Sequence, residues 1–228
     1  MSILSIGQSA LVVAQAGLAT TANNIANAST PGYSREQIIQ TEGSGQASGS
    51  GFMGTGAQVS TVQRLYNNFL ATQQNITQSS YSSLNTNYTQ ISQLNNMFAS
   101  STTGLAPTIQ NFFNSVQTAT SDPSATSSLE GVLSSAQALA TQFQSTSAQL
   151  SQINDGVNAQ IVSTVQGVNN YASQIASLNS AIQQAESTSA GQVPNDLLDQ
   201  RDEAVANLSK NTNVTVVNQG SDYNIFIG

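Results

Sequence analysis

The chain has 228 residues and a net charge of −7, and only 7% of its residues are charged. This balance argues against binding to nucleic acid or to an anionic membrane surface, because both depend on clustered basic side chains. The sequence contains no Cys and no His, which excludes disulfides and Cys/His metal clusters and removes the commonest general base and the thiol nucleophile.

Uncharged polar residues dominate the composition. Ser, Thr, Asn and Gln together account for 106 of the 228 residues, whereas an average soluble domain has about a quarter of its residues charged. Amide and hydroxyl groups can both donate and accept hydrogen bonds. Such a surface favours close packing against other copies of the same chain.

A seven-residue repeat of large apolar side chains predicts a helix over residues 2–28. Small residues lie between the large ones, as in the alternating positions of a coiled coil. The apolar stripe is too narrow to stabilise a helix alone, since helices are held mainly by tertiary packing. It must therefore find partners elsewhere in the complete chain or in neighbouring subunits, and we favour neighbouring subunits. We call this stripe the assembly seam: Leu4, Leu11, Leu18 and Ile25.

The same N-terminal segment is similar in length to a signal peptide. It has no basic residue at its start, its apolar residues are spaced rather than continuous, and nowhere do about 18–20 apolar residues follow one another. We therefore reject a signal peptide: if the protein is external, it leaves by a route that does not read a cleavable signal.

The predicted helix ends before Pro31-Gly32, a turn dipeptide. From Tyr33 to Arg64 the chain is expected to be extended or looped, with a flexible Gly/Ser-rich stretch at 43–56 and short β-like pieces at 37–39 and 59–62. A phosphate-binding loop is disfavoured at 43–56 because no Gly-Lys-Ser/Thr is present.

The region that follows is predicted to be mainly helical. Helices are expected from about 65 to 100, then with Pro107 in a first turn, then from about 125 to 186 after a break at 121–123. In the last of these, Gly131, Gly156 and Gly167 are positions where a kink or break is possible. The stripes over 88–98 and 161–182 are expected to pack within the chain.

A shorter charged helix should follow, with Asn195 as its N-cap and acidic residues in its first turns. Asp196, Asp199, Asp202 and Glu203 are interpreted as a solvated start of this helix rather than as a cation site, since dedicated sites draw their ligands from a wrapping loop. The final residues, 214–217 and 223–227, predict a β-hairpin. Because an isolated hairpin is only marginally stable, we expect the natural polypeptide to continue beyond it.

The fold class predicted from these elements is mainly α, with long antiparallel helices in a bundle, a Gly-rich extended loop and a C-terminal β-hairpin. The predicted division is a terminal domain at 1–64, a long-helix domain at 65–212, and a hairpin at 213–228 that leads towards an outer domain. No residue is proposed as catalytic, cofactor-binding or metal-binding, and no cofactor is expected.

One motif resembles a known family. The string from Ala22 to Arg35 is similar to the N-terminal motif of the axial proteins of the bacterial flagellum, which form its rod, hook and hook-associated segments. In that family a helix ends in Ala-Asn-Asn-(Ile/Leu)-Ala-Asn and is followed by Thr-Pro-Gly-Tyr and a basic residue. The matching positions are Asn23, Asn24, Asn27, Thr30, Pro31, Gly32, Tyr33 and Arg35.

The rest of the chain resembles the hook-associated branch of this family, because a long helical region follows the motif. A second segment fits the same branch: Leu198, Asp199, Gln200, Arg201 and Asp202. The resemblance implies a flagellin-like helical bundle and a non-enzymatic structural role at the hook–filament junction, outside the cell, after export through the flagellar type III apparatus. It also implies a homo-oligomeric ring, contacts with the hook protein and a neighbouring hook-associated protein, and an export chaperone that acts on a C-terminal region beyond these residues.

Two alternatives remain open from the sequence. Another axial protein, such as a rod or hook subunit, would share the motif. A secreted coiled-coil adhesin would also tolerate the Ser/Thr/Asn-rich surface, although it would have no need of the helix at 2–28.

Overall fold

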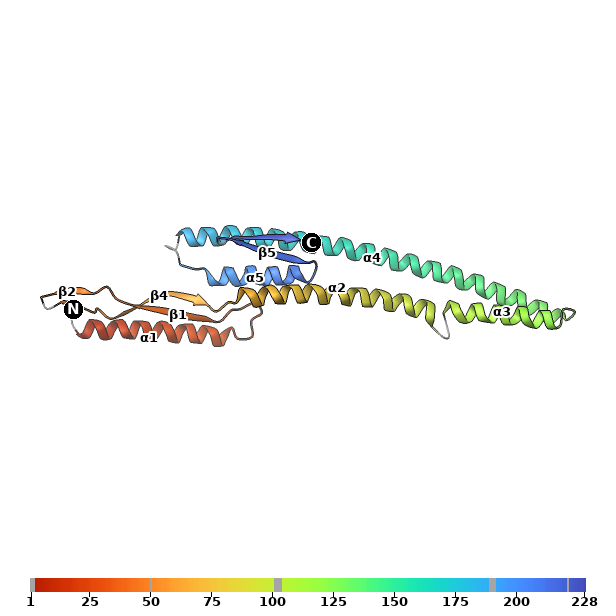
Figure 1. Cartoon of the computed structure of the whole chain (residues 1–228), viewed down its shortest axis with the longest axis horizontal. Helices are drawn as coiled ribbons and strands as arrows, with labels where there is room; N and C mark the ends of the chain where they lie inside the picture. The colour runs from red at the N-terminus through yellow and green to blue at the C-terminus, as the bar shows by residue number, and fades with distance from the viewer. Residues whose placement is uncertain (1–2, 50, 101–103, 189–191, 221) are drawn as a thin grey trace. The chain divides into compact units, whose positions relative to one another are not determined.

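The computed structural model describes residues 3–49, 51–100, 104–188, 192–220 and 222–228, and it confirms a mainly α fold (Figure 1). The Pro107 prediction is confirmed, because this proline lies in the first turn of its helix. The longest helix continues through Gly131, Gly156 and Gly167 without a break in its assignment. The helices are α1 (Ile3–Ala26), α2 (Asn68–Ala99), α3 (Leu105–Ser121), α4 (Thr126–Thr188) and α5 (Asn195–Ser209).

An antiparallel hairpin follows α1 and contacts it. Strand β1 (Glu36–Glu42) pairs with β4 (Ala57–Arg64), and the register slips between Ile39 and Gln40. Beyond them, β2 (Gln46–Ser48) pairs with β3 (Gly51–Met53). The prediction of a flexible loop at 43–56 is therefore wrong for these two short strands, because the ladder of β1 and β4 holds their ends together.

The predicted C-terminal hairpin is confirmed as β5 (Val214–Gln219) paired with β6 (Asp222–Ile227). Gly220 lies between them with a φ of 66°, a conformation that glycine adopts without steric cost. The alternation of apolar residues in β5 and β6 gives the hairpin one face for packing, and Val214, Val216, Tyr223 and Ile225 contact the core.

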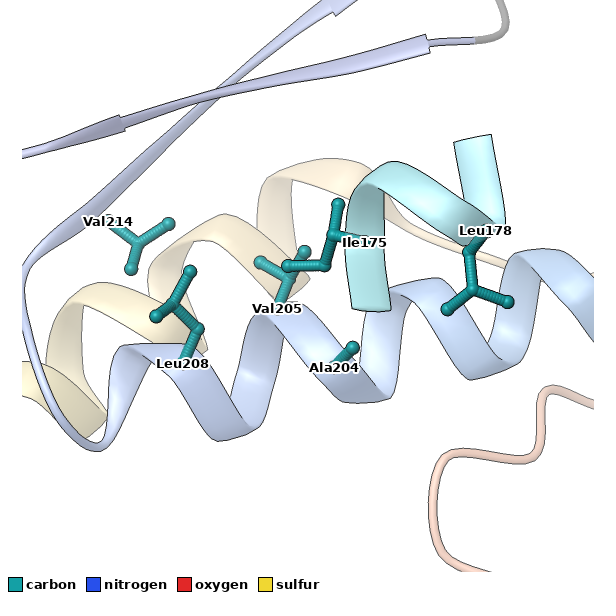
Figure 2. Packing of buried hydrophobic residues seen from close by; sticks show 6 residues of the cluster. All are labelled: Ile175, Leu178, Ala204, Val205, Leu208 and Val214. Carbon is teal, nitrogen blue, oxygen red and sulfur yellow. The ribbon is translucent and has the colours of Figure 1, made fainter. Parts of the chain in front are cut away.

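Contacts group the chain into two compact units, Met1–Ser79 with Gly167–Gly228 and Ser80–Gln166. This grouping differs from the predicted boundaries at 64 and 212. The buried apolar cluster lies in the first unit and joins α4, α5 and β5 (Figure 2). Its members are Ile175, Leu178, Ala204, Val205, Leu208 and Val214. The predicted packing of the later α4 stripe within the chain is thus confirmed for Ile175, and Ile182 is also fully buried.

The second unit contains no buried hydrophobic side chain among the residues that the structure describes. Its helices are joined by polar contacts such as the 2.5 Å hydrogen bond between the Ser115 and Ser135 hydroxyls. Tyr88, Ile91 and Ile161 are exposed, so the prediction that these stripes pack within the chain is wrong at those positions. The heptad spacing marked an apolar face correctly but could not show whether this chain covers it.

Candidate functional site: the turn after α1 and its attachment to α5

Asn24 connects the end of α1 to the start of β1. Its Oδ1 accepts hydrogen bonds from the Tyr33 hydroxyl and from the Glu36 N–H, both at 2.8 Å. Its Nδ2 donates to the Glu36 carbonyl oxygen, also at 2.8 Å. The amide thus pairs with both backbone groups of Glu36, as a neighbouring strand would, and fixes where the hairpin begins relative to α1.

The two other asparagines of the motif close the last turn of α1. The Asn27 Nδ2 donates to the Asn23 Oδ1 at 2.9 Å, and the Thr30 hydroxyl donates to the Asn27 Oδ1 at 3.2 Å. The Asn23 Nδ2 reaches the Glu36 carboxylate at 3.3 Å. These contacts between side chains hold the turn and the start of β1 against the end of α1. The motif is therefore a polar clamp that sets the direction of the chain after α1.

Gly32 is required at its position for two independent reasons. Its φ of 77° lies in the left-handed region, and a Cβ added there would be 2.9 Å from the Glu203 Cβ on α5. A side chain would therefore strain the turn and push it away from α5. The Pro-Gly dipeptide that predicts a turn in the sequence also lies close against α5.

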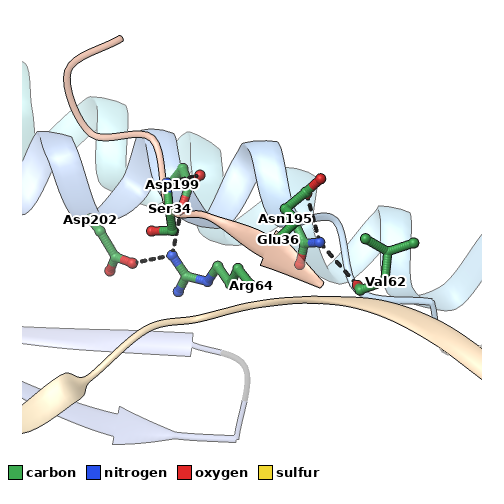
Figure 3. A network of polar contacts seen from close by, with 7 residues as sticks. All are labelled: Ser34, Glu36, Val62, Arg64, Asn195, Asp199 and Asp202. Carbon is green, nitrogen blue, oxygen red and sulfur yellow. Dashed lines mark hydrogen bonds and ion pairs between the residues drawn. The ribbon is translucent and has the colours of Figure 1, made fainter. Parts of the chain in front are cut away.

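An arginine that the sequence analysis did not single out joins the N-terminal segment to α5. Arg64 Nη1 contacts Asp199 Oδ1 at 2.9 Å and also forms an ion pair with Asp202, while the Ser34 N–H donates to Asp199 Oδ2 at 2.9 Å (Figure 3). The three charged side chains are only 9%, 11% and 12% exposed. Asp199 thus meets Ser34 of the N-terminal motif, and Asp199 and Asp202 both meet Arg64, across more than a hundred residues of sequence.

The electrostatics of this cluster keep Arg64 charged. Burial alone would lower the pKa of the Arg64 guanidinium, but the charges and hydrogen bonds of Asp202 and Asp199 raise that pKa above its ordinary value. The single buried guanidinium of Arg64 therefore pairs with both carboxylates. The interpretation of the acidic residues of α5 as a solvated helix start is wrong for Asp199 and Asp202, because tertiary packing covers both.

Asn195 does not cap α5 as predicted. Pro194 occupies the N-cap position, with no side-chain cap hydrogen bond, and Asn195 is the first helical residue. Its Nδ2 instead donates to the Glu36 carboxylate at 2.8 Å and to the Val62 carbonyl oxygen at 3.0 Å (Figure 3). The side-chain amide of Asn195 therefore binds the β1–β4 hairpin. A residue type that favours the N-cap position is used here for a long-range contact.

Arg201 faces the other side of α5 and lies inside the core. It is 2% exposed, its Nη1 donates to Asn179 Oδ1 on α4 at 2.9 Å, and its guanidinium lies 3.6 Å from the ring centre of Tyr223. The Asn179 Nδ2 donates to the Tyr223 carbonyl oxygen at 3.1 Å. Arg201 thus joins α4, α5 and β6 through a hydrogen bond and a cation–π contact.

Two tyrosines link the Arg64 and Arg201 clusters. Tyr66 and Tyr223 both lie near the Asp202 carboxylate, and the Arg64 guanidinium lies 4.3 Å from the ring centre of Tyr66. Burial first, and then the Asp202 carboxylate, raise the pKa of both tyrosines above the ordinary value of 10.0. Both phenols therefore stay neutral at physiological pH and well above it.

The remaining predicted residues lie on the surface. Pro31, Arg35 and Gln200 are exposed, and Leu198 is half-buried. The assembly seam is between 66% and 83% exposed. Val13 is buried and lies about 200° around the helix from Leu11, so most of the seam faces away from the hairpin that contacts α1. Ile25 lies at the edge of the seam and borders a hollow between α1 and β1.

Helix α1 meets the length and composition criteria for a membrane span, and only 6% of its most apolar window is buried. A signal sequence near the N-terminus or the core helix of a soluble protein meets the same criteria. In the part of the chain that the structure describes, no group of three or more Asp and Glu residues is arranged to hold a metal ion. The acidic residues nearest to such a group, Asp199 and Asp202, are paired with Arg64.

Comparison with protein families supports the identity of both halves of this site. The family model "Flagellar hook-associated protein FlgK helical domain" matches residues 91–228. The chain belongs to this family. A second model, "Flagella basal body rod protein", matches residues 4–33, which are α1 and the polar clamp. The predicted resemblance to flagellar axial proteins is therefore confirmed, and so is its hook-associated branch.

Individual relatives agree with this assignment. Flagellar hook-associated protein 1 of Salmonella typhimurium is 38% identical over 225 residues, which cover 98% of this chain and 41% of the relative. The Bacillus subtilis protein of the same name is 32% identical over 221 residues, covering 93% of this chain and 43% of the relative. The chain thus spans about two fifths of the length of these relatives.

A solved structure is also similar. The flagellar hook junction protein FlgK from Burkholderia pseudomallei matches with a TM-score of 0.61 and 40% identity, over 68% of this chain and 27% of that structure. At this identity the similarity extends to sequence as well as fold.

Proposed function

We propose that this chain is the inner, self-assembling part of a structural subunit at the junction between the bacterial hook and filament, and that it has no enzymatic activity. The observation that carries the proposal is the assembly seam. Leu4, Leu11, Leu18 and Ile25 form an apolar row at least 66% exposed on a helix whose far side is attached to the hairpin. Contiguous exposed apolar surface of this kind is typical of protein–protein interaction sites.

The polar clamp supports the proposal because it gives the seam a defined direction. Asn24 holds the end of α1 to β1, and Asn195 and Arg64 hold the hairpin to α5. An interaction surface held on a rigid element loses less conformational entropy when it binds. In this proposal the clamp residues act within the subunit, and the seam residues act between subunits.

The proposal includes a location, a route and partners. The subunit would lie outside the cell, exported through the flagellar type III apparatus without a cleavable signal. It would form a homo-oligomeric ring and contact the hook protein and a neighbouring hook-associated protein, while an export chaperone would bind beyond these 228 residues. The names of the relatives, hook-associated protein 1 and hook junction protein, support this location.

The test is a charge placed on the seam of the complete gene product. Leu11→Asp combined with Leu18→Asp should leave hooks in place but filaments unattached, with flagellin released into the medium, because each buried carboxylate would be unpaired. The matched control is Ala10→Asp, which adds a carboxylate to the same turn about 100° around the helix. Attached filaments and normal swimming in the double variant would contradict the proposal, provided that its circular dichroism matches the parent.

A further inference from the structure

The hairpin that follows α1 ends in an apolar tip. Phe52 is 84% exposed and Met53 is 59% exposed, both on β3. No charged residue occurs between Gly43 and Gln63, and glycines flank the tip on both sides. A neutral tip with two large apolar side chains can enter another protein surface without desolvating a charge.

A hollow of about 580 Å³ lies at the other end of the same element, between α1 and β1. Its apolar lining includes Ile25 and Leu65, which are 73% and 42% exposed, together with Ile38. Gly17 and Thr21 on α1 form another part of its wall. Ile25 also belongs to the assembly seam, so the hollow continues the surface proposed above to bind a neighbouring subunit.

The tip cannot fill the hollow of its own chain. The Ala57 N–H lies 3.3 Å from the Ser9 hydroxyl, so the tip end of the β1–β4 ladder is held near the start of α1. The open end is held near Asn24 through the backbone of Glu36. Ser9 and Asn24 are fifteen residues apart, which is roughly 22 Å along a helix. The tip extends beyond the start of α1, away from the hollow (Figure 1).

We infer that the tip of one copy packs into the α1–β1 hollow of the next copy, a contact that rests on the proposed self-assembly. A projection at one end of a rigid element and a hollow at its other end form a head-to-tail contact, which repeats from copy to copy and closes into a ring or continues as a helix. A buried Phe contributes 150–250 Å² of contact area, as expected of an anchor residue in such an interface.

Cysteine cross-linking tests this contact directly, because the 228 residues contain no Cys. The complete gene product carrying Met53→Cys and Thr21→Cys, which keeps the Phe52 anchor, would be assembled on cells and oxidised. We expect a ladder of disulfide-linked dimers, trimers and larger species on non-reducing gels. The control pairs Thr21→Cys with Phe226→Cys, which replaces an exposed apolar residue of the other hairpin and should give no ladder.

A second variant measures the contribution of the anchor. Phe52→Ser should reduce the number of attached filaments about tenfold or more, because a few anchor residues carry most of the binding energy of an interface. Attached filaments without a ladder in the double-cysteine strain would overturn this contact but leave the proposed function intact. A disulfide to a different protein would also overturn it. Failure of the proposed function itself would appear in the Leu11→Asp and Leu18→Asp experiment, which involves neither cysteine.

Discussion

Replacing Arg64 with Met should loosen the attachment between the N-terminal segment and α5 without unfolding the core. The substitution keeps an apolar stem of similar length but removes the only cation that contacts both Asp199 and Asp202 among the described residues. It also removes the cation–π contact with Tyr66. Residues 3–64 contribute nothing to the buried cluster of α4, α5 and β5, so that cluster should remain packed.

The expected magnitude follows from the burial of the three charges. Breaking a buried ion pair by removing one partner costs about 3–5 kcal/mol, because the remaining charge is left uncompensated. Here two carboxylates, each about 90% buried, would lose their partner. A decrease of about 3 kcal/mol in the free energy of local opening corresponds to roughly a hundredfold faster exchange or more.

Hydrogen exchange at the Ser34 amide is the most direct assay, since this N–H donates to Asp199. Its exchange should accelerate about a hundredfold in Arg64→Met, while the amides of α5 stay protected. Arg35→Met is the matched control, because Arg35 is a nearby exposed arginine. Unchanged exchange at Ser34 would refute the reasoning, and so would global unfolding, which would place Arg64 in the cooperative core. Combining Arg64→Met with Asp199→Asn and Asp202→Asn should restore part of the loss.

Two further predictions concern the same region. Gly32→Ala should lower the free energy of unfolding, measured by urea titration, by about 1–3 kcal/mol, since it combines a positive φ with a 2.9 Å approach to Glu203. Gly54→Ala, which has open space around it, should change little, and equal effects would contradict this account. The pKa values of Tyr66 and Tyr223 are raised in the folded chain, so at alkaline pH the folded chain holds more protons than the unfolded chain. The free energy of unfolding should therefore fall as the pH rises above about 10. Tyr66→Phe should flatten that fall in urea titrations, and an unchanged slope would argue that Tyr66 is not buried as described.

Local patterns in the sequence determined most of the secondary structure. The heptad spacing placed α1, and the breaks at Pro31 and Pro123 separated the helices, because proline restricts the backbone wherever it occurs. The alternation after Asn213 predicted the β5–β6 hairpin. The same spacing marked the assembly seam as an apolar row, and the motif after Ala22 indicated the flagellar family. These features depend on a few neighbouring residues, so a single sequence is enough to see them.

Only the tertiary structure decided how the site is assembled. Asn195 has the propensity of a cap, yet its amide is used by β1 and β4 from more than a hundred residues away. Arg64 gave no local signal, although it is one of only four basic residues in the chain. From the sequence, Asp199 and Asp202 are interpreted as part of a solvated helix start. In the structure, Arg64 contacts both carboxylates and Ser34 contacts Asp199, so both are buried.

Apolar periodicity shows the same division between local and long-range information. It identified a stripe in α2 and another in α4, but Ile175 is buried while Tyr88 and Ile91 are exposed. A stripe is a property of the helix that carries it, whereas burial depends on which other element reaches it. The sequence by itself therefore determined which faces need a partner. The three-dimensional arrangement decided that the core of α4 and α5 is covered within the chain and that the assembly seam of α1 is left exposed.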